Sequence, residues 1–448
     1  MTASGQPVLF TATLLVVMLL PGMMVALLCL CQKIWGFHHE LSRKAAHIGT
    51  GLLCLTFPWL FAEIWPVLVW SVATTLALLA IRCVPLFNRI MGEALCVERI
   101  SLGEMYFPIA IGTMFWLAHG DWLLYFIPVL VLTVADAVGA LVGVRYGLHR
   151  YKTQEGEKSM EGSVAFFTAA FLGTHVPLLL FSTVGRAECL LIGITIGLII
   201  MLVEAISWRG LDNLFIPIGT FYLLRSYWPL STSELVLRLI VLISLALLSI
   251  TCRNRTTLSD NALMAASLSA FGLWALGGWP YLISPLLLFI LHVFLPGFKP
   301  GPRPMLNLYA VSRVITGAYL YLFVALNFGT DTGWLPFHIC LACSTGNMVS
   351  ARLSVVCEGM SYGRHIWLSW ASTVVLFSST LLCLLPPANW LPAIVLLSIA
   401  VLVSVIVFNR YWSPAPPPLE ERPRQWFVES AVAPLAACVG WLSILLLS

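Results

Sequence analysis

Residues 122–144 read WLLYFIPVLVLTVADAVGALVGV and carry a single charged side chain, Asp136, in an otherwise apolar run. As an α-helix this segment is roughly 35 Å long at about 1.5 Å per residue, enough to cross the ~30 Å hydrocarbon core of a bilayer. A strand of a membrane β-barrel would instead alternate apolar and polar residues over about ten positions. The segment therefore predicts a transmembrane helix.

The rest of the chain repeats this pattern. Of its 448 residues, 60% are apolar and 10% are charged, whereas soluble domains are roughly 45–50% apolar and about 25% charged. Apolar blocks separated by short polar stretches predict an all-α fold, a polytopic transmembrane helix bundle of about 14–16 spans. The candidate spans are residues 8–30, 47–61, 64–81, 105–118, 122–144, 162–181, 188–206, 214–230, 233–251, 262–278, 280–296, 307–327, 335–350, 365–386, 389–408 and 426–447.

The distribution of positive charge predicts the orientation. When the chain is threaded alternately through these spans, all but three of the 24 Lys and Arg residues fall on one side, the exceptions being Arg186, Arg225 and Arg238. Cationic residues gather on the cytoplasmic side of membrane proteins, so both termini are predicted on the non-cytoplasmic side. We expect a multi-pass protein of a bacterial inner membrane. The net charge of +4 gives no reason to expect a nucleic-acid partner.

The chain divides near residue 230. Residues 1–230 contain long polar loops dense in Gly, Lys, Asp and Glu, whereas residues 231–448 are mostly apolar helix and short turn, with a Pro-rich loop at 413–424. Residues 344–350 (STGNMVS) lie in a span much as residues 135–140 (ADAVGA) do, but this echo alone does not define a repeat. We expect a first membrane domain that carries the chemistry and a second one, 231–448, whose function the sequence does not indicate.

Four polar clusters fall on the predicted cytoplasmic side, and ionisable side chains near membrane depth are costly enough to suggest function. The first cluster is HHELSRKAAH at residues 38–47. Arg43 and Lys44 precede an apolar helix, whose N-terminus offers free N–H groups and the positive end of its dipole to an anion. A basic membrane anchor is the alternative. His47, one turn further along, is a candidate general base or a packing residue.

The second cluster is TVADAVGALVGVRYG at residues 133–147. Small residues recur every four positions, among them Gly139 and Gly143, so one face of the helix allows close approach of a neighbour. An ionised Asp136 at this depth needs a cation or several hydrogen-bond donors. Metal ligand, substrate contact and partner of a buried Arg or Lys remain alternatives.

The third cluster, GEKSMEGS at residues 156–163, opens another apolar helix. Lys158, Ser159 and the free N–H groups of that helix combine the donors that bind phosphate. The spacing is not that of a Walker A loop, and an ordinary solvated loop is the alternative.

The fourth cluster holds Glu204 at the end of one span and Asp212-Asn213 before the next. Two carboxylates across a short turn could supply hard oxygen ligands to Mg²⁺, which prefers one or two carboxylates plus phosphate oxygens and waters. Asp212 is also a good candidate for a helix N-cap.

Together these segments resemble the signature of the CTP-dependent lipid-alcohol kinases, the family of dolichol, phytol and CTP-dependent diacylglycerol kinases. The similar pieces follow one another in the family's order over residues 30–225. They are ELSRKAAH at 40–47, GEMYFP at 103–108, ADAVGALVG at 135–143, EKSMEGS at 157–163 and E-x₇-D-N-x₃-P at 204–217. The second half of the chain shows no such resemblance. The resemblance implies that Arg43, Lys44, Asp136 and Gly143 are essential, and that Lys158, Glu161, Asp212 and Asn213 belong to the nucleotide site.

We therefore expect transfer of the γ-phosphoryl group of CTP, or of another nucleoside triphosphate, to an isoprenoid alcohol such as phytol or a polyprenol. Such transfer requires mainly alignment and charge neutralisation. Asp136 with Asp212 or Glu204 is predicted to bind Mg²⁺. His47 or Asp136 is the predicted base. The predicted phosphate and nucleotide contacts are Arg43, Lys44, Lys158, Ser159, Glu161, Gly139, Gly143 and Asn213.

Three alternatives remain at this point. Diacylglycerol could be the acceptor, or the chain could resemble a CDP-diacylglycerol synthase, which releases pyrophosphate instead of CDP. A transporter that uses Asp136 as a relay is the alternative of another class, although transporters of this size usually show paired broken helices in two similar halves.

Overall fold

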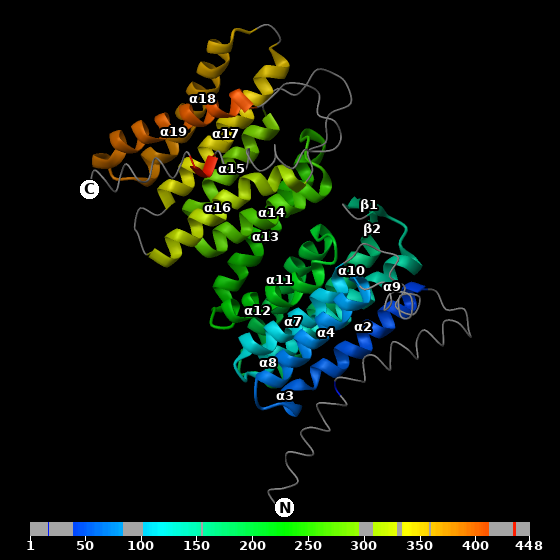
Figure 1. The fold of residues 1–448 in the computed structure, drawn as a ribbon. Helices are drawn as coiled ribbons and strands as arrows, with labels where there is room; N and C mark the ends of the chain where they lie inside the picture. Colours follow the sequence, from blue (N-terminus) through cyan, green and yellow to red (C-terminus); the bar gives the residue numbers. More distant parts are fainter. Residues whose placement is uncertain are drawn as a thin grey trace, which may run out of the picture. The chain divides into compact units, whose positions relative to one another are not determined.

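The computed structural model describes residues 17, 39–83, 102–153, 156–294, 308–328, 334–357, 360–411 and 433–435. Within these ranges the regular structure is helical apart from one short hairpin, so the predicted all-α fold class is confirmed. The chain forms two compact units, Met1–Ile240 and Val241–Ser448 (Figure 1). The division falls inside the helix α13 (Thr232–Cys252), beyond the predicted boundary at residue 230.

The first unit is a bundle of helices with a two-stranded hairpin at one end. Its elements are α2 (His39–Leu55), α3 (Phe57–Leu60), α4 (Trp65–Cys83), α7 (Gly103–Ala118), α8 (Trp122–Leu130), the π-helical turn η2 (Val131–Ala135), α9 (Asp136–Tyr146), β1 (Arg150–Thr153), β2 (Gly156–Ser159), α10 (Met160–Phe181), α11 (Arg186–Ile206) and α12 (Asp212–Tyr227). The strands β1 and β2 are antiparallel, with Tyr151 opposite Lys158.

The second unit consists of helices around a core of its own, which includes Phe337, Phe377, Leu397 and Val401. Its elements after α13 are the 3₁₀ turn η3 (Arg253–Arg255), α14 (Asp260–Gly277), α15 (Trp279–Phe294), α16 (Leu308–Phe328), α17 (Trp334–Val356), α18 (Tyr362–Leu384), the 3₁₀ turn η4 (Pro387–Asn389) and α19 (Trp390–Tyr411).

Seven helices in the described residues are long and apolar enough to cross a membrane, and this is the architecture of an integral membrane protein. They are Trp65–Cys83, Trp122–Tyr146, Met160–Phe181, Arg186–Ile206, Thr232–Arg255, Tyr362–Leu384 and Pro387–Arg410, and Trp279–Phe294 and Ala310–Leu326 are shorter apolar helices. Each predicted span between residues 47 and 408 coincides with a helix or a run of helices. Apart from residue 17 and residues 433–435, the predicted spans 8–30 and 426–447 lie outside the described residues, and the sidedness of the termini stays a prediction.

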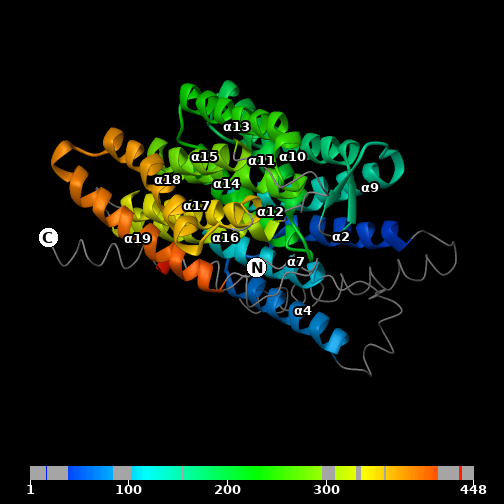
Figure 2. The same ribbon diagram turned by 90° about the horizontal axis from the view of Figure 1, so that it is seen from above.

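Packing in the first unit explains how these helices are held. The face of α4 that carries Leu68, Val72 and Leu76 is exposed, as expected for side chains that meet lipid. In the interior, α9 packs against both α2 and α10 (Figures 1 and 2). At the other end of α8–α9, the carboxylate of Asp121 caps α8 by accepting hydrogen bonds from the backbone N–H groups of Leu123 and Leu124, at 3.0 and 3.2 Å.

Candidate active site

Asp136 is placed by an irregularity in its helix. The run from Trp122 to Tyr146 is continuous, but Val131–Ala135 form a π-helical turn, and Asp136 begins α9 directly after it. Within this turn the hydroxyl of Thr133 donates to the carbonyl oxygen of Val129 at 2.7 Å. Isolated π turns widen a helix locally and are frequent at functional sites. Asp136 is 9% exposed, so its carboxylate requires partners inside the bundle.

The main partner is Lys44 on α2. Its Nζ lies 2.7 Å from Oδ2 of Asp136 and 3.5 Å from the backbone oxygen of the same residue. Lys44 is itself only 4% exposed. The structure thus pairs Asp136 with a buried Lys, one of the alternatives that the sequence leaves open. Removal of either residue would deprive the other buried charge of this ion-pair partner, which is strongly destabilising.

His47 lies one turn further along α2 and faces the same carboxylate. Its Nε2 is 3.6 Å from Oδ2 of Asp136 and 3.3 Å from the carbonyl oxygen of Leu132. The imidazole ring packs edge-on against Phe107, with 4.9 Å between ring centroids. The structure therefore brings together Lys44, His47 and Asp136, and their catalytic role stays a prediction. Arg43 belongs to α2, but its side chain lies outside the described part of the structure.

Lys158 comes to the site from the hairpin. It lies on β2, and its Nζ is 2.6 Å from both Oε1 and the backbone oxygen of Glu204, near the end of α11. Burial by itself lowers the pKa of Lys158, but the carboxylates of Glu204 and Asp212 outweigh burial and hold the pKa above its usual value. Lys158 thus remains an ammonium group and ties the hairpin to α11.

A tight turn brings Asp212 back toward Glu204. Residues 207–211 join α11 to α12, and both Arg209 and Gly210 adopt the left-handed conformation, with φ of 55° and 77°. A non-glycine residue in this region carries backbone strain and tends to occur where structure or function requires it. Burial and the charge of Asp136 raise the pKa of Asp212 above its usual value, against the lowering effect of Lys158.

Asn213 follows at the second position of α12 and is anchored to another helix. Its Nδ2 donates to the carbonyl oxygen of Gly103 at 2.9 Å, where α7 begins. Its backbone N–H donates to Oδ1 of Asp212 at 3.0 Å. Among the described residues its Oδ1 is buried and has no hydrogen-bond partner.

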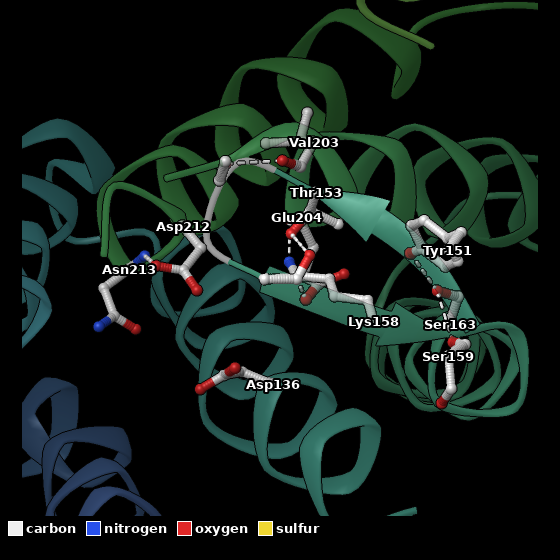
Figure 3. Close-up of polar contacts among 12 residues, drawn as sticks. Asp136, Tyr151, Thr153, Lys158, Ser159, Ser163, Val203, Glu204, Asp212 and Asn213 are labelled. Carbon is white, nitrogen blue, oxygen red and sulfur yellow. Dashed lines mark hydrogen bonds and ion pairs between the residues drawn. The ribbon is translucent and has the colours of Figure 1, made fainter. Parts of the chain in front are cut away.

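Three carboxylates and one amide thus gather around one end of the bundle. Figure 3 shows Asp136, Glu204, Asp212 and Asn213 arranged around Lys158 and β2. Asp136 and Asp212 are close enough for each to act electrostatically on the other, and both act on Glu204. Across the described ranges, no three His, Cys, Asp or Glu side chains are placed to hold a metal ion by themselves. This arrangement suits a cation that takes part of its ligands from phosphate and water, as Mg²⁺ does.

The remaining predicted residues make packing and capping contacts. The smooth face of α9 receives α10: a Cβ atom at Gly139 would lie 2.9 Å from Cβ of Phe166, and one at Gly143 would lie 3.2 Å from Oγ of Ser159. Ser159 caps α10 by accepting from the N–H of Gly162 at 3.1 Å. These contacts explain the small residues at these positions by helix packing.

Glu161 points toward the loop between α9 and β1. Its carboxylate accepts from the backbone N–H of Leu148 at 3.1 Å and from that of His149 at 3.2 Å, and it lies 2.7 Å from Nδ1 of His149. In the structure Glu161 therefore fixes the base of the hairpin, and its contacts do not include the carboxylates of the site.

Tyr151 is a site residue that the sequence did not single out. It lies opposite Lys158 in the hairpin, its hydroxyl is 2.8 Å from Oγ of Ser163, and its ring is partly buried. Burial raises its pKa above the usual value. The signal available in the sequence was a single aromatic residue within a polar loop, which does not reveal a hairpin.

Comparison with known proteins identifies a relative of this chain. The chain is similar to the phytol kinase of Synechocystis sp., with 32% identity over 185 residues. That stretch makes up 40% of this chain and 76% of the relative. No protein-family model matches the sequence, and no solved structure matches it. Since the similarity covers more than two thirds of the relative, the chain belongs to the phytol kinase family.

Proposed function

We propose that the protein is a membrane-embedded kinase that transfers the γ-phosphoryl group of CTP to the hydroxyl group of an isoprenoid alcohol, such as phytol or a polyprenol. The observation that carries this proposal is the pairing of Lys44 with Asp136 at 2.7 Å and of Lys158 with Glu204 at 2.6 Å at the same end of one bundle. Cations of this kind suit a polyphosphate, and carboxylates suit its metal. The similarity to a phytol kinase supports the isoprenoid acceptor.

Phosphoryl transfer requires the acceptor oxygen, the γ-phosphorus and the leaving oxygen to lie in line. In the proposed reaction the alcohol oxygen forms a bond to the γ-phosphorus, the bond to the bridging oxygen breaks, and CDP leaves. Lys44 and Lys158 stabilise the charge on the phosphate oxygens. A divalent cation, when bound, neutralises charge on the β- and γ-phosphates, and Asp136 with Asp212 would hold it.

The proton of the alcohol must move to a base within hydrogen-bond reach. His47 and Asp136 are the two candidates, and their side chains lie 3.6 Å apart. The proposed site faces the cytoplasm, where nucleotide is available, in line with the distribution of Lys and Arg.

The test is an assay of purified protein with [γ-³²P]CTP and phytol. Asp136→Asn keeps the shape of the side chain and removes its charge, so we expect phosphoryl transfer to fall at least about 10³-fold while the protein is still expressed and inserted. Asp121→Asn is the matched control, because Asp121 caps the other end of the same helical run and Asn is an equally good cap.

Full activity of Asp136→Asn would overturn the proposal. A parallel assay with [α-³²P]CTP distinguishes phosphoryl transfer from the reaction of a CDP-diacylglycerol synthase. Label from the α-phosphate in the lipid product would show that a cytidylyl group, and not a phosphoryl group, is transferred. Parallel reactions with diacylglycerol test the alternative acceptor.

A further inference from the structure

The side-chain amide of Asn213 can adopt only one orientation. Its Nδ2 donates to the carbonyl oxygen of Gly103 at 2.9 Å. A carbonyl oxygen can only accept, so the nitrogen of the amide must face Gly103, and the oxygen must face away. The assignment of the two amide atoms, often uncertain in proteins, is fixed here by the chemistry of the partner.

In this orientation the amide oxygen of Asn213 lacks a hydrogen-bond partner within the described ranges. Oδ1 of Asn213 is buried and has no hydrogen-bond partner in the described residues. Buried side-chain oxygens nearly always accept a hydrogen bond or bind a cation, because desolvation is otherwise uncompensated. Figure 3 shows this oxygen on the side of the amide toward Asp136.

The neighbouring groups select the kind of partner. Asp212 precedes Asn213 in the chain, and its carboxylate acts electrostatically on that of Asp136. When ionised, carboxylates only accept hydrogen bonds, so neither can satisfy another acceptor. A divalent cation would satisfy the amide oxygen and both carboxylates at once. A neutral amide oxygen also adds a hard ligand without adding negative charge to carboxylates that already repel one another.

Glu204 differs from Asp136 and Asp212 in its contacts. Its carboxylate and its backbone oxygen both hold Nζ of Lys158 at 2.6 Å. Lys44 engages Asp136 in a similar way, at 2.7 Å, so an ammonium contact alone does not set Glu204 apart. The difference lies in the strongest neighbouring charge, which is the ammonium group of Lys158 for Glu204 but the carboxylate of Asp136 for Asp212.

We propose that Asn213 is a ligand of the divalent cation, together with Asp136 and Asp212, and that Glu204 positions Lys158 instead of binding metal. This inference rests on the proposed kinase function, because it assigns the ligands of the metal that the nucleotide requires.

Metal binding without nucleotide tests the assignment separately from catalysis. Mn²⁺ binding to the purified full-length protein in detergent can be followed by electron paramagnetic resonance. We expect Asn213→Ala to weaken Mn²⁺ binding at least about tenfold. Glu204→Gln should leave Mn²⁺ affinity within about twofold of wild type, while it weakens binding of CTP. Asn409→Ala, in the second unit, is the matched control and should leave both unchanged.

Asn213→Asp distinguishes a role as metal ligand from a purely structural role through the hydrogen bond to Gly103. It keeps an oxygen at Oδ1 but loses the Nδ2 donor to Gly103, so both Asn213 variants should show lowered thermal stability. If Asn213 is a ligand, Asn213→Asp binds Mn²⁺ as well as wild type or better. If both variants lose Mn²⁺ affinity equally, Asn213 acts only through Gly103, and the proposal is wrong.

Two other outcomes also overturn it. Unchanged Mn²⁺ affinity in Asn213→Ala would mean that Oδ1 accepts from the nucleotide or the alcohol, and a wild-type protein that binds no Mn²⁺ without nucleotide would mean that these residues do not form a metal site. Failure of the kinase proposal looks different: wild type would bind Mn²⁺ through Asn213 but transfer no phosphate.

Discussion

Lys44 and Asp136 illustrate how single residues determine this site. Both are almost fully buried, and they lie on helices that are far apart in the sequence. A buried ion pair contributes little net stability, because desolvation offsets the attraction between the charges, but the loss of one partner is costly. The pair is therefore better explained by a requirement for charge at this depth than by stability.

A double-mutant cycle tests this view. Lys44→Met leaves the carboxylate of Asp136 without its ammonium partner, so we expect the free energy of unfolding to fall by roughly 3 kcal/mol. Lys44→Met combined with Asp136→Asn removes both charges and should recover much of that loss without recovering phosphoryl transfer. Unfolding in detergent, followed by tryptophan fluorescence, gives the change in the free energy of unfolding for the two single variants and for the double variant. Additive effects of the two substitutions would contradict direct pairing.

The sequence identified these residues but not their partners. Asp136 stands out because a carboxylate in an apolar run is costly, but the sequence alone does not show that Lys44 is its partner. The amide of Asn213 was placed in the nucleotide site by resemblance. Its tie to Gly103, which fixes the direction of Oδ1, joins residues too distant in sequence for any local pattern to reveal.

At the scale of elements, the contact between α9 and α10 shows why small residues recur in this region. A Cβ atom at Gly162 would lie 2.9 Å from the backbone oxygen of Gly139 and 3.0 Å from Cα of Gly143. Backbone atoms cannot move aside as a flexible side chain can. The two helices therefore depend on glycine at this crossing.

Two alanine substitutions on α10 measure this dependence. Gly162→Ala should lower the free energy of unfolding by about 1–3 kcal/mol, because α9 and α10 must separate. Gly173→Ala is the matched control, since its Cβ atom would meet only ordinary contacts, the nearest at 3.5 Å from Val131. It should be neutral or slightly stabilising, because alanine favours helix. Thermal unfolding compares the two, and equal losses would argue against the close crossing.

Elements differed in how well the sequence predicted them. The apolar helices followed directly from hydropathy, because burial in lipid leaves a continuous apolar run. The hairpin β1–β2 was not predicted: residues 150–159 read RYKTQEGEKS, and neither four-residue strand alternates apolar and polar side chains. Since Glu161 holds the base of this hairpin, its contacts could not be foreseen either.

For the whole molecule, the division into two units has a direct functional implication. Every described residue of the proposed site belongs to Met1–Ile240, and the second unit has its own core. Two contacts tie the beginning of α13 to the first unit: Thr232 with Glu188, and Arg238 over the ring of Tyr227. A truncation that preserves the first unit should therefore retain the whole of α13.

Removal of residues after Cys252 tests whether the first unit is sufficient. We expect the shortened protein to transfer phosphate to phytol within about tenfold of the full chain, because it keeps Lys44, Asp136 and Lys158 in place. Assays of both forms against a panel of prenols and diacylglycerol show whether the second unit alters acceptor preference. A folded but inactive truncation, judged by size-exclusion chromatography, would show that the second unit contributes to the reaction.

The π-helical turn at Val131–Ala135 determines the direction in which each later side chain of that helix points. One surplus residue rotates the remainder of a helix by about 100° around its axis. If the chain had continued as a regular α-helix, the carboxylate of Asp136 would point in a different direction around the helix axis and would not face α2. Deletion of Val131 or Leu132, which are buried and precede the signature that begins at Ala135, would thus turn the carboxylate of Asp136 away from Lys44 while every signature residue stayed in the chain.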